Sequence, residues 1–329
     1  MPREKGQVRA TLALGATLLG IGLTVVLVGH IGVGAIGNVL LAVGWTGFLA
    51  IVAIHVAIIA VMGSAWHILA PQGGPLRSFI WGRFVRDGGS EVLPLSQIGG
   101  YVLGARAAML GGVPGIIATA STIVDVTIDL IAQLGYTTLG LACLIMLKPH
   151  APVILPVAAG LVAAAVVAGM FIGSQRHGFD ALDRLGRWIG AGWAEGTAAR
   201  AAAIHQSIHR IYRARRRVVL SFFLHFGCWT VGAVEVWLAL RLIGSPLSPG
   251  ATLALESLLY AVRSLAFFVP NAVGVQEGAY VLLGASFGLT PDVALAVSLL
   301  KRARDLAIGV PVLCVWQGQE GLRLSRRSN

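Results

Sequence analysis

Long apolar runs, separated by shorter polar segments, set the pattern of this chain. Runs of about 20 apolar residues or more are long enough to cross a membrane as helices. Six such runs predict six membrane-spanning helices, at roughly 10–30, 38–69, 116–147, 153–174, 218–243 and 292–316. Trp45 and Trp66 lie near the two ends of the second run, as interfacial aromatic anchors do.

Two further apolar segments are interrupted. The first, 92–112, is short, rich in glycine and carries Arg106; the second, 249–289, is broken where Pro270 is followed by Gly274. A proline with a glycine four residues on ends a helix. Broken backbone survives in a membrane only where protein or a water-filled cavity satisfies it, and discontinuous helices mark transporter binding sites. Both segments are therefore predicted to be re-entrant hairpins.

The two interrupted segments resemble each other. Each has a proline-to-proline interval that encloses a Tyr-Val-Leu run, and an acid follows in the next helix. The matching residues are Pro94, Tyr101, Pro114 and Asp129 in the first copy and Pro270, Tyr280, Pro291 and Asp305 in the second. An inverted repeat of this kind is typical of transporters. Chance similarity in a sequence rich in Gly, Leu and Val is the competing explanation.

Two polar segments interrupt the apolar pattern. Residues 71–91 are predicted to form a polar, basic loop, and residues 176–217 a larger insert with nine arginines against three acids. Apolar residues recur at helical spacing in the insert, which predicts a basic amphipathic helix or helix pair on the membrane surface. Beside a membrane helix, the cluster Arg213–Arg217 indicates a patch for anionic lipid, or simply the excess of positive charge on the cytoplasmic side, rather than a nucleic-acid site.

Composition agrees with a membrane protein. Hydrophobic residues make up 56% of the chain and charged residues only 12%, whereas a soluble domain carries about 25% charged residues. The three cysteines lie in apolar runs without a CxxC pair, so neither a disulfide framework nor a zinc site is indicated. The first apolar run is too long for a signal peptide. We predict a single integral membrane domain over 1–329.

Basic residues are distributed unequally between the loops. With a cytoplasmic N-terminus, 18 Lys and Arg residues fall on the cytoplasmic side, and only Lys148 and Arg241 fall outside. Positive charge favours the cytoplasmic side. Both termini are therefore predicted to be cytoplasmic.

Several ionisable residues remain within apolar runs, where each costs at least a few kcal/mol unless it is paired or faces a polar cavity. Helical spacing arranges the main ones in three stripes: Asp125 and Asp129 with Ser121 and Gln133; Glu256 and Arg263 with Tyr260; and Lys301, Arg304 and Asp305. Buried ion pairs that only fix helix packing would explain any one of them. The whole set, beside two broken helices, favours a path for a lipid headgroup or an ion.

Pro270, Gly274 and Glu277, the apolar helix that follows, and a charged last span with Arg302 or Arg304 resemble the transmembrane, flippase-like domain of the lysylphosphatidylglycerol synthase family. Within that family, the segments starting at Glu91 and Ala120 are similar to hopanoid biosynthesis-associated proteins of the HpnL type. The resemblance implies a protein of the bacterial inner membrane that moves polar lipids between leaflets. It implies Glu277 and the arginine of the last span as site residues.

Two departures from the family pattern matter. The usual Pro-Gly-Gly is here Pro270-Asn271-Ala272, which implies a stiffer hinge, and no aminoacyl-transfer domain is expected. We expect a lipid translocase without cofactor, acting on a hopanoid or other polar lipid, alone, as a homo-oligomer or beside enzymes of lipid synthesis. A headgroup-modifying enzyme that uses Asp125 and Asp129, or a non-catalytic scaffold, remains the alternative.

Overall fold

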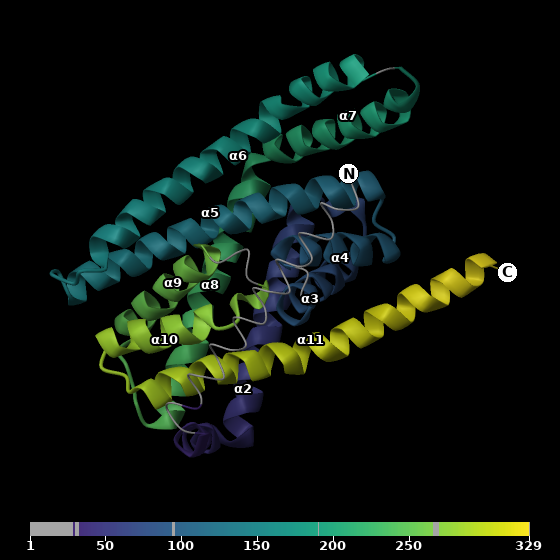
Figure 1. The fold of residues 1–329 in the computed structure, drawn as a ribbon. Helices are drawn as coiled ribbons and strands as arrows, with labels where there is room; N and C mark the ends of the chain where they lie inside the picture. Colours follow the sequence, from purple (N-terminus) through teal and green to yellow (C-terminus); the bar gives the residue numbers. More distant parts are fainter. Residues whose placement is uncertain (1–28, 30–32, 94–95, 190, 266–269, 329) are drawn as a thin grey trace.

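Every regular element of the described chain is a helix. The computed structural model describes residue 29 and residues 33–93, 96–189, 191–265 and 270–328. Its helices, drawn in Figure 1, are α2 (Val33–Leu69), α3 (Leu76–Val92), α4 (Ser96–Leu110), α5 (Gly115–Leu147), α6 (Ile154–Ile189), α7 (Ala191–Arg213), α8 (Arg215–Ile243), α9 (Pro249–Leu265), α10 (Val275–Ser286) and α11 (Pro291–Ser328), with single turns η1 (Pro71–Gly73) and η2 (Pro270–Ala272). The predicted helix at 10–30 lies almost entirely outside the described residues.

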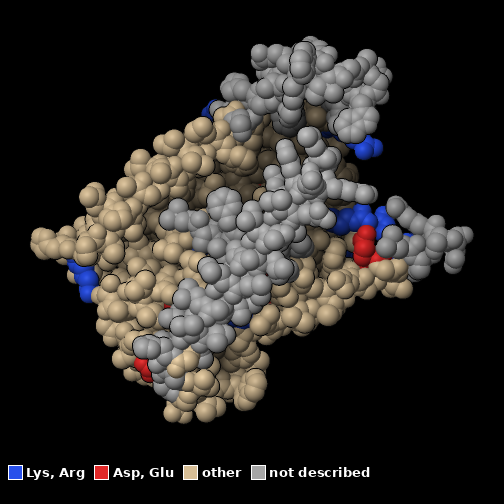
Figure 2. Space-filling view, in the orientation of Figure 1, with Lys and Arg blue, Asp and Glu red and all other residues tan. Residues whose placement is uncertain are grey.

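Four of these helices are long and apolar enough to cross a membrane: Ile36–Leu69, Gly115–Leu147, Ile154–Gly173 and Arg215–Ile243. Large apolar side chains on α6, such as Leu155 and Met170, are 78% and 71% exposed. On the face shown in Figure 2, charged side chains are few and most lie toward the ends of the molecule. An apolar outer surface suits lipid rather than water. The prediction of an all-helical, polytopic membrane protein is confirmed.

The prediction of a loop at 71–91 is wrong. Most of this segment forms α3, which turns back at Leu93 into α4. The hairpin therefore consists of α3 and α4. The segment 92–112, which the sequence predicts to form a complete re-entrant hairpin, supplies only the second helix of this hairpin. A Cβ atom added at Gly104 would lie 2.6 Å from Arg86 Cβ and 2.7 Å from the Gly82 carbonyl oxygen. Glycine at this position lets the two backbones approach closely, as small residues do between membrane helices.

The basic insert forms a helix pair, one of the two arrangements that the sequence predicts. α6 continues without interruption to Ile189, and α7 runs back alongside it (Figure 1). Ile208 and Ile211 of α7 are buried in one apolar cluster with Val124 and Ile128 of α5. Packing on α5 therefore fixes α7, while its position relative to the membrane surface stays a prediction.

The two halves of the chain share one order of elements. In each, a long helix (α2 or α8) precedes a helix that ends at a break (α3 or α9), a short helix (α4 or α10), and a long helix that starts at a proline (Pro114 before α5, Pro291 opening α11). Figure 1 shows α5 and α11 running in opposite directions, with α3–α4 and α9–α10 at opposite ends. This arrangement agrees with the inverted repeat expected from the sequence.

Candidate functional site

A polar cavity of about 420 Å³ lies among the helices of both halves. Its walls come from α2, α3, α4, α5, α8, α9, α11 and the break at η2. Side chains of both charges line it, together with His55: Arg83, Arg86, Arg263 and Arg304 with Asp87, Glu91, Asp129, Glu235 and Asp305. Charged groups inside a membrane protein are stable when they pair with one another or face a polar cavity. The charged groups named above face such a cavity.

On one side of the cavity, two arginines of α3 bind two aspartates of α5. Arg86 donates from Nη1 to Asp125 Oδ2 at 2.7 Å and from Nη2 to Asp129 Oδ2 at 3.1 Å. Arg83 Nη1 donates to the same Asp129 oxygen at 3.2 Å, and Trp229 Nε1 to its other oxygen at 3.0 Å. All four charged side chains are buried. The Asp125–Asp129 stripe therefore pairs with basic residues of α3, in a segment that the sequence predicts to be a loop.

A buried histidine completes this cluster. His225 is fully buried on α8, and its Nδ1 donates to the Ser221 carbonyl at 2.9 Å, since a carbonyl can only accept. Its Nε2 therefore faces Asp125 Oδ1, 3.4 Å away. Polar side chains of three helices, α3, α5 and α8, meet at this point, although His225 Nε2 and Asp125 Oδ1 form no hydrogen bond with each other.

A second cluster joins α2, α8 and α11. Arg304 donates to Glu235 and, at 2.7 Å, from Nη2 to Asp305 Oδ1. His55 Nδ1 lies 2.9 Å from Glu235 Oε1. All four residues of this cluster line the cavity: Arg304, Asp305, Glu235 and His55. The second cluster and the Arg83–Asp129 cluster therefore face the same cavity, each with basic and acidic side chains.

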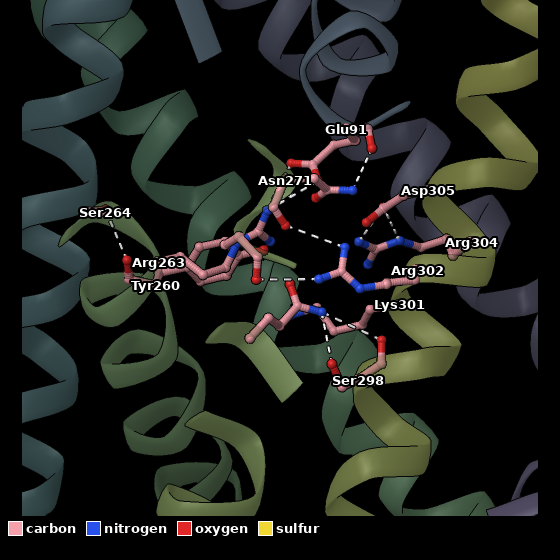
Figure 3. A network of polar contacts seen from close by, with 12 residues as sticks. Glu91, Tyr260, Arg263, Ser264, Asn271, Ser298, Lys301, Arg302, Arg304 and Asp305 are labelled. Carbon is pink, nitrogen blue, oxygen red and sulfur yellow. Dashed lines mark hydrogen bonds and ion pairs between the residues drawn. The ribbon is translucent and has the colours of Figure 1, made fainter. Parts of the chain in front are cut away.

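The break in the second half is held by a buried ion pair. Glu277 accepts the Gly274 backbone N–H at 2.7 Å, at the start of α10. Arg302 of α11 donates to both Glu277 oxygens, at 3.1 Å for Oε2. Its Nη1 donates to the Asn271 carbonyl at 3.3 Å (Figure 3). Backbone groups freed by a break need such partners in a membrane. Of the two arginines considered, Arg302 is the partner of Glu277.

Further contacts tie the break to both halves. Arg263 of α9 donates to Glu91 of α3 at 3.0 Å, and Asn271 donates to the Glu91 carbonyl (Figure 3). Deeper in the protein, Lys301 Nζ donates to Glu256 at 2.6 Å, and the Tyr280 hydroxyl donates to the other Glu256 oxygen. The expectation that each intramembrane charge is paired or faces a polar cavity is confirmed for these residues.

The predicted site residues divide into two groups. Asp129, Arg263, Arg304 and Asp305 line the cavity. The others do not line it: Asp125, Glu256, Glu277 and Arg302 are ion-pair partners beside it, Gly274 caps α10, and Pro270 opens η2. The cavity is thus lined by one group and supported by the other.

Sequence reasoning missed Arg83, Arg86, Glu91 and His55. The two arginines were assigned to a loop because the local composition is polar. One signal was present for His55, which is the one ionisable residue between Asn38 and Trp66. The apolar runs already offer Arg263, Lys301 and Arg304 as partners for the two aspartates, so nothing pointed to Arg83 and Arg86.

The geometry also bears on metal binding. Asp129 accepts hydrogen bonds at both carboxylate oxygens, whereas Asp125 accepts one at Oδ2 and its Oδ1, 3.4 Å from His225 Nε2, has no hydrogen-bond partner among the described residues. Within the ranges that the structure describes, no group of three or more His, Cys, Asp or Glu side chains is placed to hold a metal ion.

Comparison with known families gives one match. The model of the lysylphosphatidylglycerol synthase transmembrane region covers residues 12–312, nearly the whole chain. The chain belongs to this family. No curated protein and no solved structure matches it. Family membership makes this a membrane protein connected with lipids, and the match spans the cavity and both broken segments.

Proposed function

We propose that this protein is a lipid translocase, and that the central cavity receives the polar headgroup of the lipid. The observation that carries the proposal is a charged cavity of about 420 Å³ within an apolar helical body. A headgroup that crosses a bilayer must exchange its water for other polar partners. The cavity offers such partners while the acyl chains stay in the surrounding lipid.

The cavity suits a headgroup that forms hydrogen bonds with both donors and acceptors. Arg263 and Arg304 supply donors, and Asp129 and Asp305 supply acceptors. A hopanoid or another lipid with a polar headgroup has this chemistry. The narrower resemblance to HpnL-type proteins supports the hopanoid, because both segments that carry it contribute to the cavity wall, through Tyr101 and Asp129.

Binding explains the carboxylates better than headgroup modification does. Asp129 accepts hydrogen bonds at both carboxylate oxygens, from Arg83, Arg86 and Trp229, and Asp125 is bound by Arg86, is fully buried and does not line the cavity. A general base needs a free lone pair directed at its substrate. This pairing supports a translocation path over an acid–base site.

We place the protein in a bacterial inner membrane with both termini in the cytoplasm. Arg77, the arginines of the α7–α8 junction and Arg323 lie toward one end of the bundle, whereas Lys148 and Arg241 close the opposite ends of α5 and α8. The excess of basic residues at one end supports the cytoplasmic assignment.

The test is transport of fluorescent polar lipids in proteoliposomes, with leaflet-resolved quenching. Arg263→Gln removes a cavity donor but leaves Glu91 unpaired, so the double variant Glu91→Gln/Arg263→Gln serves as the matched control. Loss of one charged hydrogen bond to the headgroup, roughly 1.5 kcal/mol, slows transport about tenfold. Both variants are expected to show this loss.

Transport restored in the double variant would show that Arg263 acts only through its ion pair. Absence of transport of every candidate lipid by folded, reconstituted wild-type protein would overturn the proposal. Conversion of a lipid into a new species during the assay would favour the enzyme alternative.

A further inference from the structure

A second cavity, of about 740 Å³, lies away from the central one, at the junction of α7 and α8. The end of α2, the η1 turn and the start of α5 close its other side. Five arginines line it: Arg210, Arg213, Arg215, Arg216 and Arg217. The sequence predicts a basic surface here, but not an open hollow between these five elements.

The charge of this cavity is uncompensated. In the part of the chain that the structure describes, none of the five arginines forms an ion pair with a carboxylate. This differs from the central cavity, where arginines and carboxylates are matched. Concentrated charge of one sign attracts a counter-ion of the other. All five arginines are exposed, so their charge is accessible to an anion.

Neutral and backbone groups add to the attraction. Gln72 and Ser207 line the cavity with the arginines. The 29-residue helix α8 begins here, and its N-cap residue, Ala214, makes no side-chain capping bond. The partial positive charge at a helix N-terminus favours a phosphate group. Guanidinium groups bind phosphate oxygens in pairs.

The remaining wall is apolar, which distinguishes a lipid from a free anion. Leu69, Ala70, Ile117 and Ile211 face the same space. Three membrane-crossing helices meet here, since α2 ends at Leu69, α5 begins at Gly115 and α8 begins at Arg215. The cavity is thus at the end of the apolar body, where headgroups of a bilayer lie.

We infer that this cavity is a second lipid site, which binds the phosphate-bearing headgroup of an anionic lipid with its apolar wall against the upper part of an acyl chain. Arg215 and Cys228, which lines the central cavity, are 13 residues apart on α8, a distance of about 20 Å. The second site does not rest on the proposed translocation and can exist without it.

The test uses the full chain in nanodiscs of phosphatidylcholine with a minor fraction of cardiolipin or phosphatidylglycerol. Bound lipid is counted by native mass spectrometry after release from the disc. The site variant is Arg213→Gln/Arg216→Gln/Arg217→Gln. The control, Arg77→Gln/Arg200→Gln/Arg323→Gln, removes the same charge from exposed arginines outside the cavity. Glycerol phosphate and inorganic phosphate are added as soluble competitors.

About 1 kcal/mol per arginine near a surface predicts a loss in affinity on the order of 100-fold for the site variant. Wild type and control are expected to retain anionic lipid, and soluble phosphates are expected to compete weakly because they lack the apolar contact. If the site variant and the control retained the same amount of anionic lipid, the proposal would be overturned, because the net charge of the protein alone would then determine how much lipid binds. If inorganic phosphate displaced the bound lipid as effectively as added anionic lipid does, the ligand of this cavity would be a free anion and the proposed lipid site would be wrong. Transport measured on the same site variant tests the central cavity separately.

Discussion

Two consecutive residues at the break, Asn271 and Ala272, have left-handed backbone conformations, with φ of 52° and 46°. Only glycine adopts this region freely, and for other residues it costs roughly 1–2 kcal/mol. These are the positions at which the resemblance implies Gly-Gly. The Asn271 side chain donates a hydrogen bond to the Glu91 carbonyl, whereas the methyl side chain of Ala272 cannot form one and only its carbonyl accepts, from Arg302.

Ala272→Gly is therefore expected to stabilise the protein by about 1 kcal/mol, because it relieves the strained conformation. Thermal unfolding in detergent measures the change. The matched control is Ala279→Gly in α10, also buried, where glycine in a regular helix lowers stability by about 1 kcal/mol. Opposite signs for the two substitutions support the strain; a loss of stability in both would show that the lost Cβ contacts dominate.

At the scale of residues, the sequence predicts which side chains need partners but not always which partners they take. Helical spacing identified Asp125 and Asp129 as one stripe, and both are paired from one helix, α3. It could not identify Arg83 and Arg86, because their burial depends on α3 packing against α5. Periodicity along one helix carries no information about its neighbour.

At the scale of elements, the close packing of α3 against α4 depends on glycines at the contact between the two helices. In the sequence these glycines are visible only as a Gly-rich stretch. A Cβ at Gly104 would meet the backbone of Gly82 and the Cβ of Arg86, neither of which can rotate away. Gly104→Ala is expected to push α4 from α3 and lower stability by about 1–3 kcal/mol, as overpacking does. Because Arg86 lies at the contact, lipid transport should fall with it.

The control for this change is Gly227→Ala in α8, where an added Cβ would meet nothing within 4 Å. Alanine there is expected to keep or raise stability, since alanine favours helix over glycine by about 1 kcal/mol. Unfolding midpoints of the two variants, measured in the same detergent, decide the matter. Equal effects would mean that the close approach of α3 and α4 does not limit stability.

Elements were easier to predict where hydropathy alone decides. The apolar runs at 116–147 and 218–243 became α5 and α8 with ends within a few residues. The segment 71–91 was misassigned because α3 is polar by composition, yet its polar side chains point inward to a cavity. A helix that buries charge reverses the usual relation between polarity and exposure, and only tertiary packing reveals it.

At the scale of the whole molecule, the excess of basic residues at one end predicts its orientation. Arg83 and Arg86 no longer count toward it, because both are buried in the central cluster. Arg77, Arg200, Arg323 and the arginines of the α7–α8 junction remain exposed. The asymmetry therefore persists, and so does the expectation that this end faces the cytoplasm.

Single cysteines in a chain without its own three cysteines test the orientation. The exposed residues His150, after α5, and Arg323, near the end of α11, lie at opposite ends. We expect a membrane-impermeant maleimide to label His150→Cys in intact cells and Arg323→Cys only after the cells are permeabilised. The reverse pattern would place the α7–α8 cavity on the outer face. The anionic lipid would then have to come from the outer leaflet, and the positive charges of that cavity would have been retained for lipid binding rather than for topology.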